Sequence, residues 1–134
     1  GQPFSAPQYL WPRPSATAEF GYNPAASGGS NSGPTNPDYL KTVAERVKAL
    51  RDSGITGPIP AELVQASASG LDPHLSPQAA RLQVSRIARA RGVSETTVLK
   101  LIEEATEQPH LGILGAARVN VLAVNMGLDR VNAD

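Results

Sequence analysis

Few side chains in this sequence have the types and spacing that catalysis requires. Ser69, Asp72 and His74 lie within six residues and supply the three side-chain types of a hydrolytic triad. A working triad needs the base oriented between nucleophile and acid, and its members usually come from separate parts of a fold. Asp72 is also followed by Pro73, a pair that is typical of an ordinary turn. We therefore expect no catalysis at this cluster.

Metal and phosphate sites are no better supported by the residue pattern. The two histidines, His74 and His110, are far apart and the chain has no cysteine, so the usual zinc spacings are absent. The glycine-rich segment 28–33 precedes an expected helix, as phosphate-binding loops do. It is followed by Pro34 and Thr35, where a P-loop needs lysine and then serine or threonine. We expect a tight loop there, and neither a catalytic nor a metal site in the chain.

The strongest local pattern is a pair of capped helices joined by a short turn, over residues 77–106. Gly92 ends the first helix and Ser94 begins the second, an arrangement typical of DNA-binding helix-turn-helix units. The second helix should read the DNA, yet it bears three glutamates and one lysine, and phosphates repel an acidic helix. A DNA-binding module is therefore kept as the alternative function. Four arginines on the first helix favour DNA binding: Arg81, Arg86, Arg89 and Arg91.

Capping residues, prolines and apolar periodicity predict three helices. The first begins at Asn36-Pro37 and ends at Gly54, the second runs from Ser76-Pro77 to Gly92, and the third runs from Ser94 to just before Pro109. Two strands are expected, at 63–68 and 118–124, where apolar or β-branched runs lie beside glycine and proline. Helices and strands do not alternate regularly. The sequence therefore predicts an α+β fold, with three helices packed against a small β-sheet.

We predict that residues 1–36 form an extended arm with a glycine-rich loop, packed on an α+β core of residues 37–134 within one domain. Residues 1–37 hold seven of the twelve prolines and five of the twelve glycines, which excludes a long helix or a central strand. Five of the six aromatic residues also lie here, whereas disordered linkers are poor in aromatics. We expect these rings to anchor an ordered arm. A dedicated ligand-binding aromatic cluster is the alternative.

Composition fits one soluble globular domain. The chain has 134 residues, 40% of them hydrophobic, and its twelve basic and twelve acidic residues balance. A net charge of zero gives no overall attraction to nucleic acid or to an anionic membrane. Residues 1–8 lack the features of a signal peptide. The apolar window 111–128 is interrupted by Arg118, Asn120 and Asn125, so we do not expect it to span a membrane.

Several stretches together resemble the KdpC family, the small accessory subunits of the bacterial potassium-pumping P-type ATPase KdpFABC. They occur in the family's order and cover the chain from about Gln2 to Val131. Gly127 and Ser32 depart from the pattern, since larger residues are usual there. The matching stretches are RPSAT (13–17), YNPAASGGSN (22–31), PAELVQASASGLDPHLSPQAA (60–80), QVSRIARARGVS (83–94) and RVNVLAVNMGLD (118–129).

The resemblance implies a non-catalytic accessory subunit in the cell (inner) membrane. Its single N-terminal membrane helix is absent from this chain, and its soluble domain lies on the extracytoplasmic side. The implied partners are the potassium-channel-like and ATP-hydrolysing subunits of the pump, near the potassium entrance, and not nucleic acid. The resemblance also implies a catalytic-chaperone role that raises the affinity of the ATP-hydrolysing subunit for ATP.

The glutamine that the family associates with nucleotide binding falls on Gln83, so ATP is an implied ligand although no firmly bound cofactor is expected. An extracytoplasmic domain cannot touch cytoplasmic ATP, so any effect must pass through the membrane subunits. The alternative is that Gln83 only caps or cross-links a helix surface.

We expect the partner interface on the arm and its glycine-rich loop, because exposed backbone donors, rigid turns and large rings suit recognition. The residues expected there are Phe4, Tyr9, Trp11, Arg13, Tyr22, Asn23, Gly28, Gly29 and Asn31.

Overall fold

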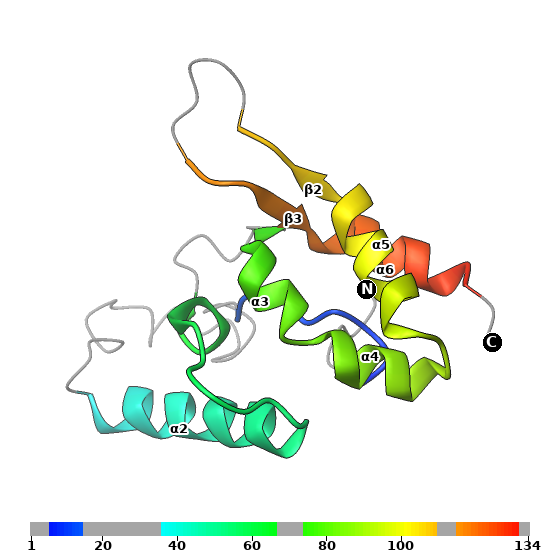
Figure 1. Cartoon of the computed structure of the whole chain (residues 1–134). Coiled ribbons are helices and arrows are strands. Elements are labelled where there is room, and N and C mark those ends of the chain that lie inside the picture. Colours follow the sequence, from blue (N-terminus) through cyan, green and yellow to red (C-terminus); the bar gives the residue numbers. More distant parts are fainter. Residues whose placement is uncertain (1–5, 15–35, 67–73, 110–114, 132–134) are drawn as a thin grey trace. The chain divides into compact units, whose positions relative to one another are not determined.

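The computed structural model of this chain describes residues 6–14, 36–66, 74–109 and 115–131 (Figure 1). The chain forms two compact units. Unit 1 contains Gly1–Pro12 and Pro73–Asp134, and unit 2 contains Arg13–Asp72. The start of the chain thus belongs with the C-terminal half. The arm-and-core boundary expected after residue 36 stays a prediction, because residues 15–35 lie outside the described part.

Unit 2 contains the first predicted helix, α2 (Pro37–Asp52). The Asn36 side chain accepts hydrogen bonds from the main-chain N–H groups of Asp38 and Tyr39, which satisfies two of the donors left over at a helix start. Ser53 is the C-cap, and Gly54 follows with φ of 106°, a conformation that favours glycine. Both predicted ends of this helix are confirmed.

The strand predicted at 63–68 is wrong for the residues that the structure describes. Ala61–Leu63 form a short 3-10 helix, η2, whose main-chain hydrogen bonds are local. The Arg46 guanidinium donates to the carbonyl oxygen of Val64, so a side chain occupies an acceptor that a neighbouring strand would use. Residues 67 and 68 lie outside the described part.

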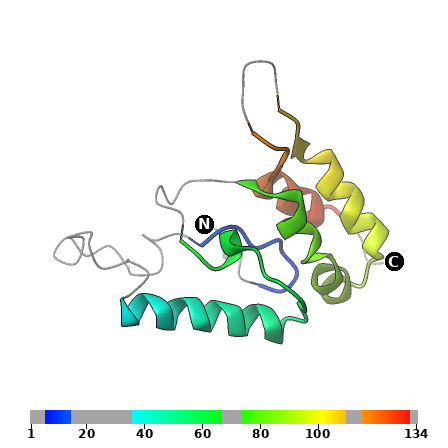
Figure 2. The ribbon, with the colours of Figure 1, turned by 60° about the vertical axis from the view of Figure 1, so that its left-hand side comes forward.

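Four helices of unit 1 are α3 (Pro77–Arg81), α4 (Val84–Arg91), α5 (Glu95–Glu104) and α6 (Val121–Asp129). The second predicted helix is thus two helices, interrupted at Leu82 and Gln83. Its predicted caps are confirmed, since Ser76 caps α3 and Gly92 ends α4 with φ of 70°. Helix α5 begins after Ser94 as predicted and ends four residues early. It contacts both α4 and α6, and α5 and α6 lie side by side in Figures 1 and 2.

A three-stranded antiparallel sheet accompanies these helices, in the order β1 (His74–Leu75), β3 (Arg118–Asn120) and β2 (Thr106–Glu107). In the register, Val119 lies opposite both Leu75 and Thr106. Val119 and Leu75 are buried, so this face of the sheet belongs to the core. Because side chains alternate along a strand, the residues on either side of Val119 lie on the other, polar face. The α+β fold class is confirmed, although β1 and β2 had no sequence signal.

The strand predicted at 118–124 is right only as far as Asn120. The Asn120 side chain accepts from the N–H of Ala123 and caps α6, which outweighs the β-branched residues that follow. Gly127 is therefore helical, and a Cβ there would come within 2.9 Å of Leu101 Cδ2. Close packing against α5 explains a small residue at this position. In the described ranges, no helix is long and apolar enough to cross a membrane.

We predict that Gly92→Ala lowers the free energy of unfolding by about 1 kcal/mol, because its left-handed conformation strains any residue with a Cβ. The matched control is Gly127→Ala, where helical backbone favours alanine and only the flexible end of Leu101 must move. Urea unfolding followed by circular dichroism measures both. An equal or greater loss for Gly127→Ala would contradict this account.

Candidate functional site

The part of the N-terminal arm that belongs to unit 1 is held there through its main chain, and from here on the word arm refers to this part. Both polar main-chain groups of Leu10 pair with one side-chain amide: its N–H donates to Asn125 Oδ1 at 2.8 Å, and its carbonyl accepts from Asn125 Nδ2 at 3.0 Å. Trp11 is bound in the same way by Gln83, through Oε1 at 2.8 Å and Nε2 at 3.1 Å. Asn125 lies on α6 and Gln83 directly precedes α4. Each side-chain amide thus makes the two main-chain hydrogen bonds that a neighbouring strand would otherwise make.

Two arginines of α4 bind the carbonyls that precede Leu10. Arg86 donates from Nε to the carbonyl of Pro7 at 3.1 Å, and from Nη2 to the carbonyl of Tyr9. Arg91 donates from Nε to the carbonyl of Gln8 at 2.6 Å. Every carbonyl from Pro7 to Trp11 therefore accepts a side-chain hydrogen bond. We call Gln83, Arg86, Arg91 and Asn125 the arm clamp.

Arg86 is the most unusual member of the arm clamp, because it is only 6% exposed. Its Nη2 also donates to Gln83 Oε1 at 2.8 Å, which joins the two residues. Its Cζ lies 3.8 Å from the centre of the Trp11 ring, a cation–π arrangement. Burial lowers the pKa of Arg86 to about 10, so the side chain stays charged at neutral pH. A buried charge is costly unless it is well paired, and most of its partners here come from the arm.

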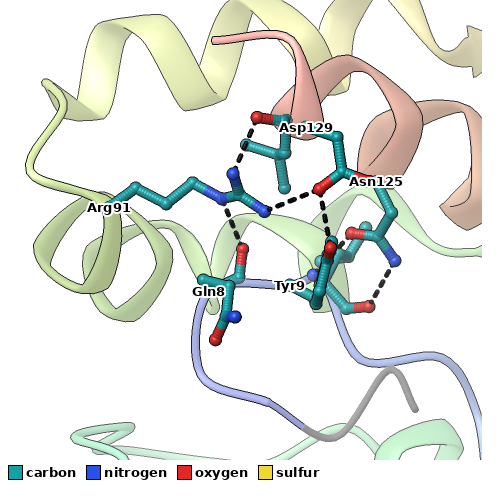
Figure 3. Close-up of polar contacts among 7 residues, drawn as sticks. Gln8, Tyr9, Arg91, Asn125 and Asp129 are labelled. Carbon is teal, nitrogen blue, oxygen red and sulfur yellow. Dashed lines mark hydrogen bonds and ion pairs between the residues drawn. The ribbon is translucent and has the colours of Figure 1, made fainter. Parts of the chain in front are cut away.

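Tyr9 attaches the arm to Asp129 at the end of α6, as Figure 3 shows. The Tyr9 hydroxyl donates to Asp129 Oδ1 at 2.6 Å, and this hydrogen bond raises the pKa of Tyr9. Arg91 lies over the Tyr9 ring, with its Cζ 5.0 Å from the ring centre, and forms an ion pair with Asp129 at 3.5 Å. Arg91 also donates to the carbonyl of Leu128 at 2.7 Å. It thereby joins the arm to the end of α6.

The structure brings three of the expected site residues together: Tyr9, Trp11 and Gln83. Gln83 is fully buried, and its amide uses both its acceptor and its donor on Trp11. Arg13 is half-buried and belongs to unit 2. The remaining expected interface residues lie outside the described part of the chain: Phe4, Tyr22, Asn23, Gly28, Gly29 and Asn31.

Asn125 and Arg86 are site residues that the sequence analysis missed. Asn125 is a polar residue inside the apolar run of α6, at a buried position between Val124 and Met126. An amide in such a position signals a specific hydrogen-bond partner, because buried polar groups are normally paired. Arg86 was counted only among the four arginines that favour DNA binding, whereas its side chain is buried.

A second polar cluster lies on the outer face of the sheet. His74 Nε2 and Glu107 Oε1 are 2.9 Å apart, and Asn120 Nδ2 donates to Glu107 Oε2 at 3.4 Å. The hydrogen bonds from Asn120 and then from His74 lower the pKa of Glu107. Ser69 and Asp72, the other members of the suspected triad, lie outside the described residues. Among those that the structure describes, no group of three or more His, Cys, Asp or Glu side chains could hold a metal ion.

The hydrogen bonds of Arg86 and Arg91 to the arm weaken the DNA-binding alternative. Both side chains bind the arm, so two of the four arginines that favoured DNA binding cannot reach DNA phosphates. The helix pair itself is real, since α4 and α5 pack together through the turn at Gly92. A helix-turn-helix that reads DNA is therefore not supported.

Comparisons with known proteins give one consistent family. A family model described as KdpC, the K+-transporting ATPase c chain, matches residues 1–130. The potassium-transporting ATPase KdpC subunit of Trichlorobacter lovleyi is 82% identical over 129 residues, which are 96% of this chain and 68% of that protein. The subunit of the same name from Geobacter sulfurreducens is 68% identical over 129 residues, with the same shares of 96% and 68%. That of Geobacter metallireducens is 66% identical over 131 residues, 98% of this chain and 69% of the relative.

We predict that Asn125→Leu lowers the free energy of unfolding by about 2–4 kcal/mol, because it leaves the buried N–H and carbonyl of Leu10 unpaired. The control is Met126→Leu, an exposed neighbour on α6, which should change stability by less than about 0.5 kcal/mol. Urea denaturation of both variants tests this. Equal stability of the two would show that the amide does not hold the arm.

We also predict that the contribution of Glu107 to the stability of the fold depends on pH and is lost in acid. A carboxylate whose pKa is lowered on folding stabilises the protein above its unfolded pKa, near 4.5 here, and loses that effect as pH falls through its folded pKa. The wild type should thus be more stable than Glu107→Gln at pH 6, and the difference should vanish in stronger acid. Thermal unfolding of both proteins across this range measures it, and parallel pH profiles would refute it.

Proposed function

This chain belongs to the KdpC family of potassium-transporting ATPase subunits, and we propose that it is the non-catalytic accessory domain that supports assembly and activity of such a pump. The observation that carries the proposal is the family match over residues 1–130, together with relatives as close as 82% identity. We further propose that the domain lies at the cell membrane on its extracytoplasmic side. Its partners there are the channel-like and ATP-hydrolysing subunits.

The use of the buried polar side chains supports a binding role. In the described residues these are Gln83, Arg86 and Asn125, and all three bind the main chain of the arm. Groups arranged for catalysis normally converge on a site that a substrate can enter. Here they converge on the protein's own chain. This arrangement suits a domain whose task is to present a fixed surface.

We propose that any effect of this domain on nucleotide affinity is transmitted through the pump. The Gln83 amide is buried, and a nucleotide would have to displace the main chain of Trp11 to reach it. Loss of those hydrogen bonds would leave Trp11 groups unpaired, at a cost of about 1–3 kcal/mol each. Coupling between two conformational states of the complex requires no such displacement. A catalytic-chaperone role is compatible with this indirect route.

The partner interface is proposed to include residues 1–36, with the glycine-rich loop at 28–33. Tyr9 and Trp11 are half-buried, so each residue packs on the fold and also remains partly accessible to solvent. Aromatic residues fixed in this way are favourable at interfaces, because little side-chain freedom is lost on binding.

We predict that a pump purified with a full-length subunit loses potassium-stimulated ATPase activity when the region equivalent to residues 1–130 is deleted from that subunit. Co-purification of the pump subunits and their ATPase activity, with and without potassium, are the measurements. The control is the Met126→Leu subunit, which should behave as the wild type. Unchanged assembly together with unchanged activity after the deletion would refute the proposed function.

Two titrations of the isolated chain address the other function classes. Calorimetric titration with ATP should give no binding, and Gln83→Ala should give the same trace. Duplex DNA should show no mobility shift even at low salt, where phosphate contacts are strongest. Saturable ATP binding that Gln83→Ala abolishes would establish the direct nucleotide role instead.

A further inference from the structure

We infer that Gln83, Asn125 and Arg86 are all positioning residues for the pump, and that each of them acts by holding the main chain of the arm. This inference rests on the proposed function, because it names how the accessory domain is held in its active form. It assigns roles to two residues for which the resemblance implied none, and it gives Gln83 a mechanism that needs no nucleotide contact.

The first argument is the direction of the hydrogen bonds. In an extended segment, both polar groups of one residue point to one side, and those of the next residue point to the other. Asn125 on α6 binds both groups of Leu10, and Gln83 beside α4 binds both groups of Trp11. The two amides therefore hold the arm from opposite sides. Releasing either one frees the same segment.

The second argument is chemical. A main-chain N–H and carbonyl on one residue require a partner with one acceptor and one donor, and among side chains an amide supplies this pair at the right spacing. Glutamate and aspartate have nearly the same shape but only accept when ionised. Gln83→Glu and Asn125→Asp therefore keep the volume of the side chain and remove the donor. They are the sharpest variants for separating the clamp from simple packing.

The third argument is the place of the clamp in the chain. Trp11 is followed by Pro12, the last residue of the first segment of unit 1, and unit 2 begins at Arg13. Holding the main chain at Leu10 and Trp11 therefore fixes the point at which the chain leaves unit 1. Arg86 strengthens this by linking Gln83 to the Tyr9 carbonyl and to the Trp11 ring. The arm clamp thus holds the main chain directly before the point where unit 2 begins.

The isolated chain tests the clamp by itself, because Trp11 is its single tryptophan. We expect Gln83→Glu and Asn125→Asp each to shift Trp11 emission to the red and to increase its quenching by acrylamide. The double variant should show no larger effect than the stronger single variant, since both release one segment. Met126→Leu serves as the control and should leave emission unchanged. Unchanged emission in Asn125→Asp, with the helical circular dichroism intact, would overturn the clamp.

The assembled pump tests the positioning role. We expect Gln83→Glu and Asn125→Asp to change the same kinetic constant, KM for ATP or kcat, in the same direction and non-additively, while the subunit still co-purifies. Simple destabilisation would lower the amount of assembled pump instead. A change in KM for ATP with Gln83→Glu alone would overturn the inference in favour of direct nucleotide contact. Normal kinetics in both variants, despite arm release in the isolated chain, would also overturn it.

A second variant covers the case in which Asn125→Asp does not fold. Arg86→Lys keeps the positive charge, but one ammonium group cannot span the Pro7 and Tyr9 carbonyls as the guanidinium does. It should reproduce the red shift of Trp11 and the kinetic change seen with Gln83→Glu. Failure to do so in a folded Arg86→Lys pump would overturn the shared role. The deletion described above is independent, so loss of the proposed function itself would be recognised separately.

Discussion

Hydrogen bonding of a main-chain segment that is buried at Leu10 and partly buried beside it is the constraint on which unit 1 depends. The segment Pro7–Trp11 enters the domain without a neighbouring strand, and an unpaired buried N–H or carbonyl costs as much as several ordinary contacts. Side chains supply the missing partners. Asn125 and Gln83 each pair both the N–H and the carbonyl of one residue, and Arg86 and Arg91 bind carbonyls. The domain therefore stays compact with only a small three-stranded sheet.

Several irregular features of the fold can be understood from this constraint. The interruption between α3 and α4 places Gln83 at the start of a helix, where its amide lies against Trp11. The polar Asn125 in an otherwise apolar helix has its partner in Leu10. The buried Arg86 would be unfavourable alone and becomes tolerable beside the Tyr9 carbonyl and the Trp11 ring. These residues form one network, so their effects should not be additive.

Local signals predicted the ends of helices well, since Asn36, Ser76 and Ser94 all cap helices and Gly92 ends one. They failed where a tertiary contact or a competing cap decided the outcome. The residues after Asn120 are helical because its side chain caps α6, although β-branched residues there favour a strand. In the candidate site, Tyr9 and Trp11 were expected as partner-interface residues and Gln83 as a nucleotide-associated residue, and these roles stay predictions. Arg86 was missed because helical periodicity cannot show that the main chain of a distant segment covers one face.

The central claim is that side-chain amides hold the arm, and hydrogen exchange at the Leu10 and Trp11 amides tests it most directly. Both N–H groups are bound only by side chains, Leu10 by Asn125 and Trp11 by Gln83. The account predicts slow exchange of both amides in the wild-type chain, and fast exchange of both in Gln83→Glu while amides within α5 remain protected. Exchange of the Leu10 and Trp11 amides in the wild type at the rate of an unstructured peptide would contradict it.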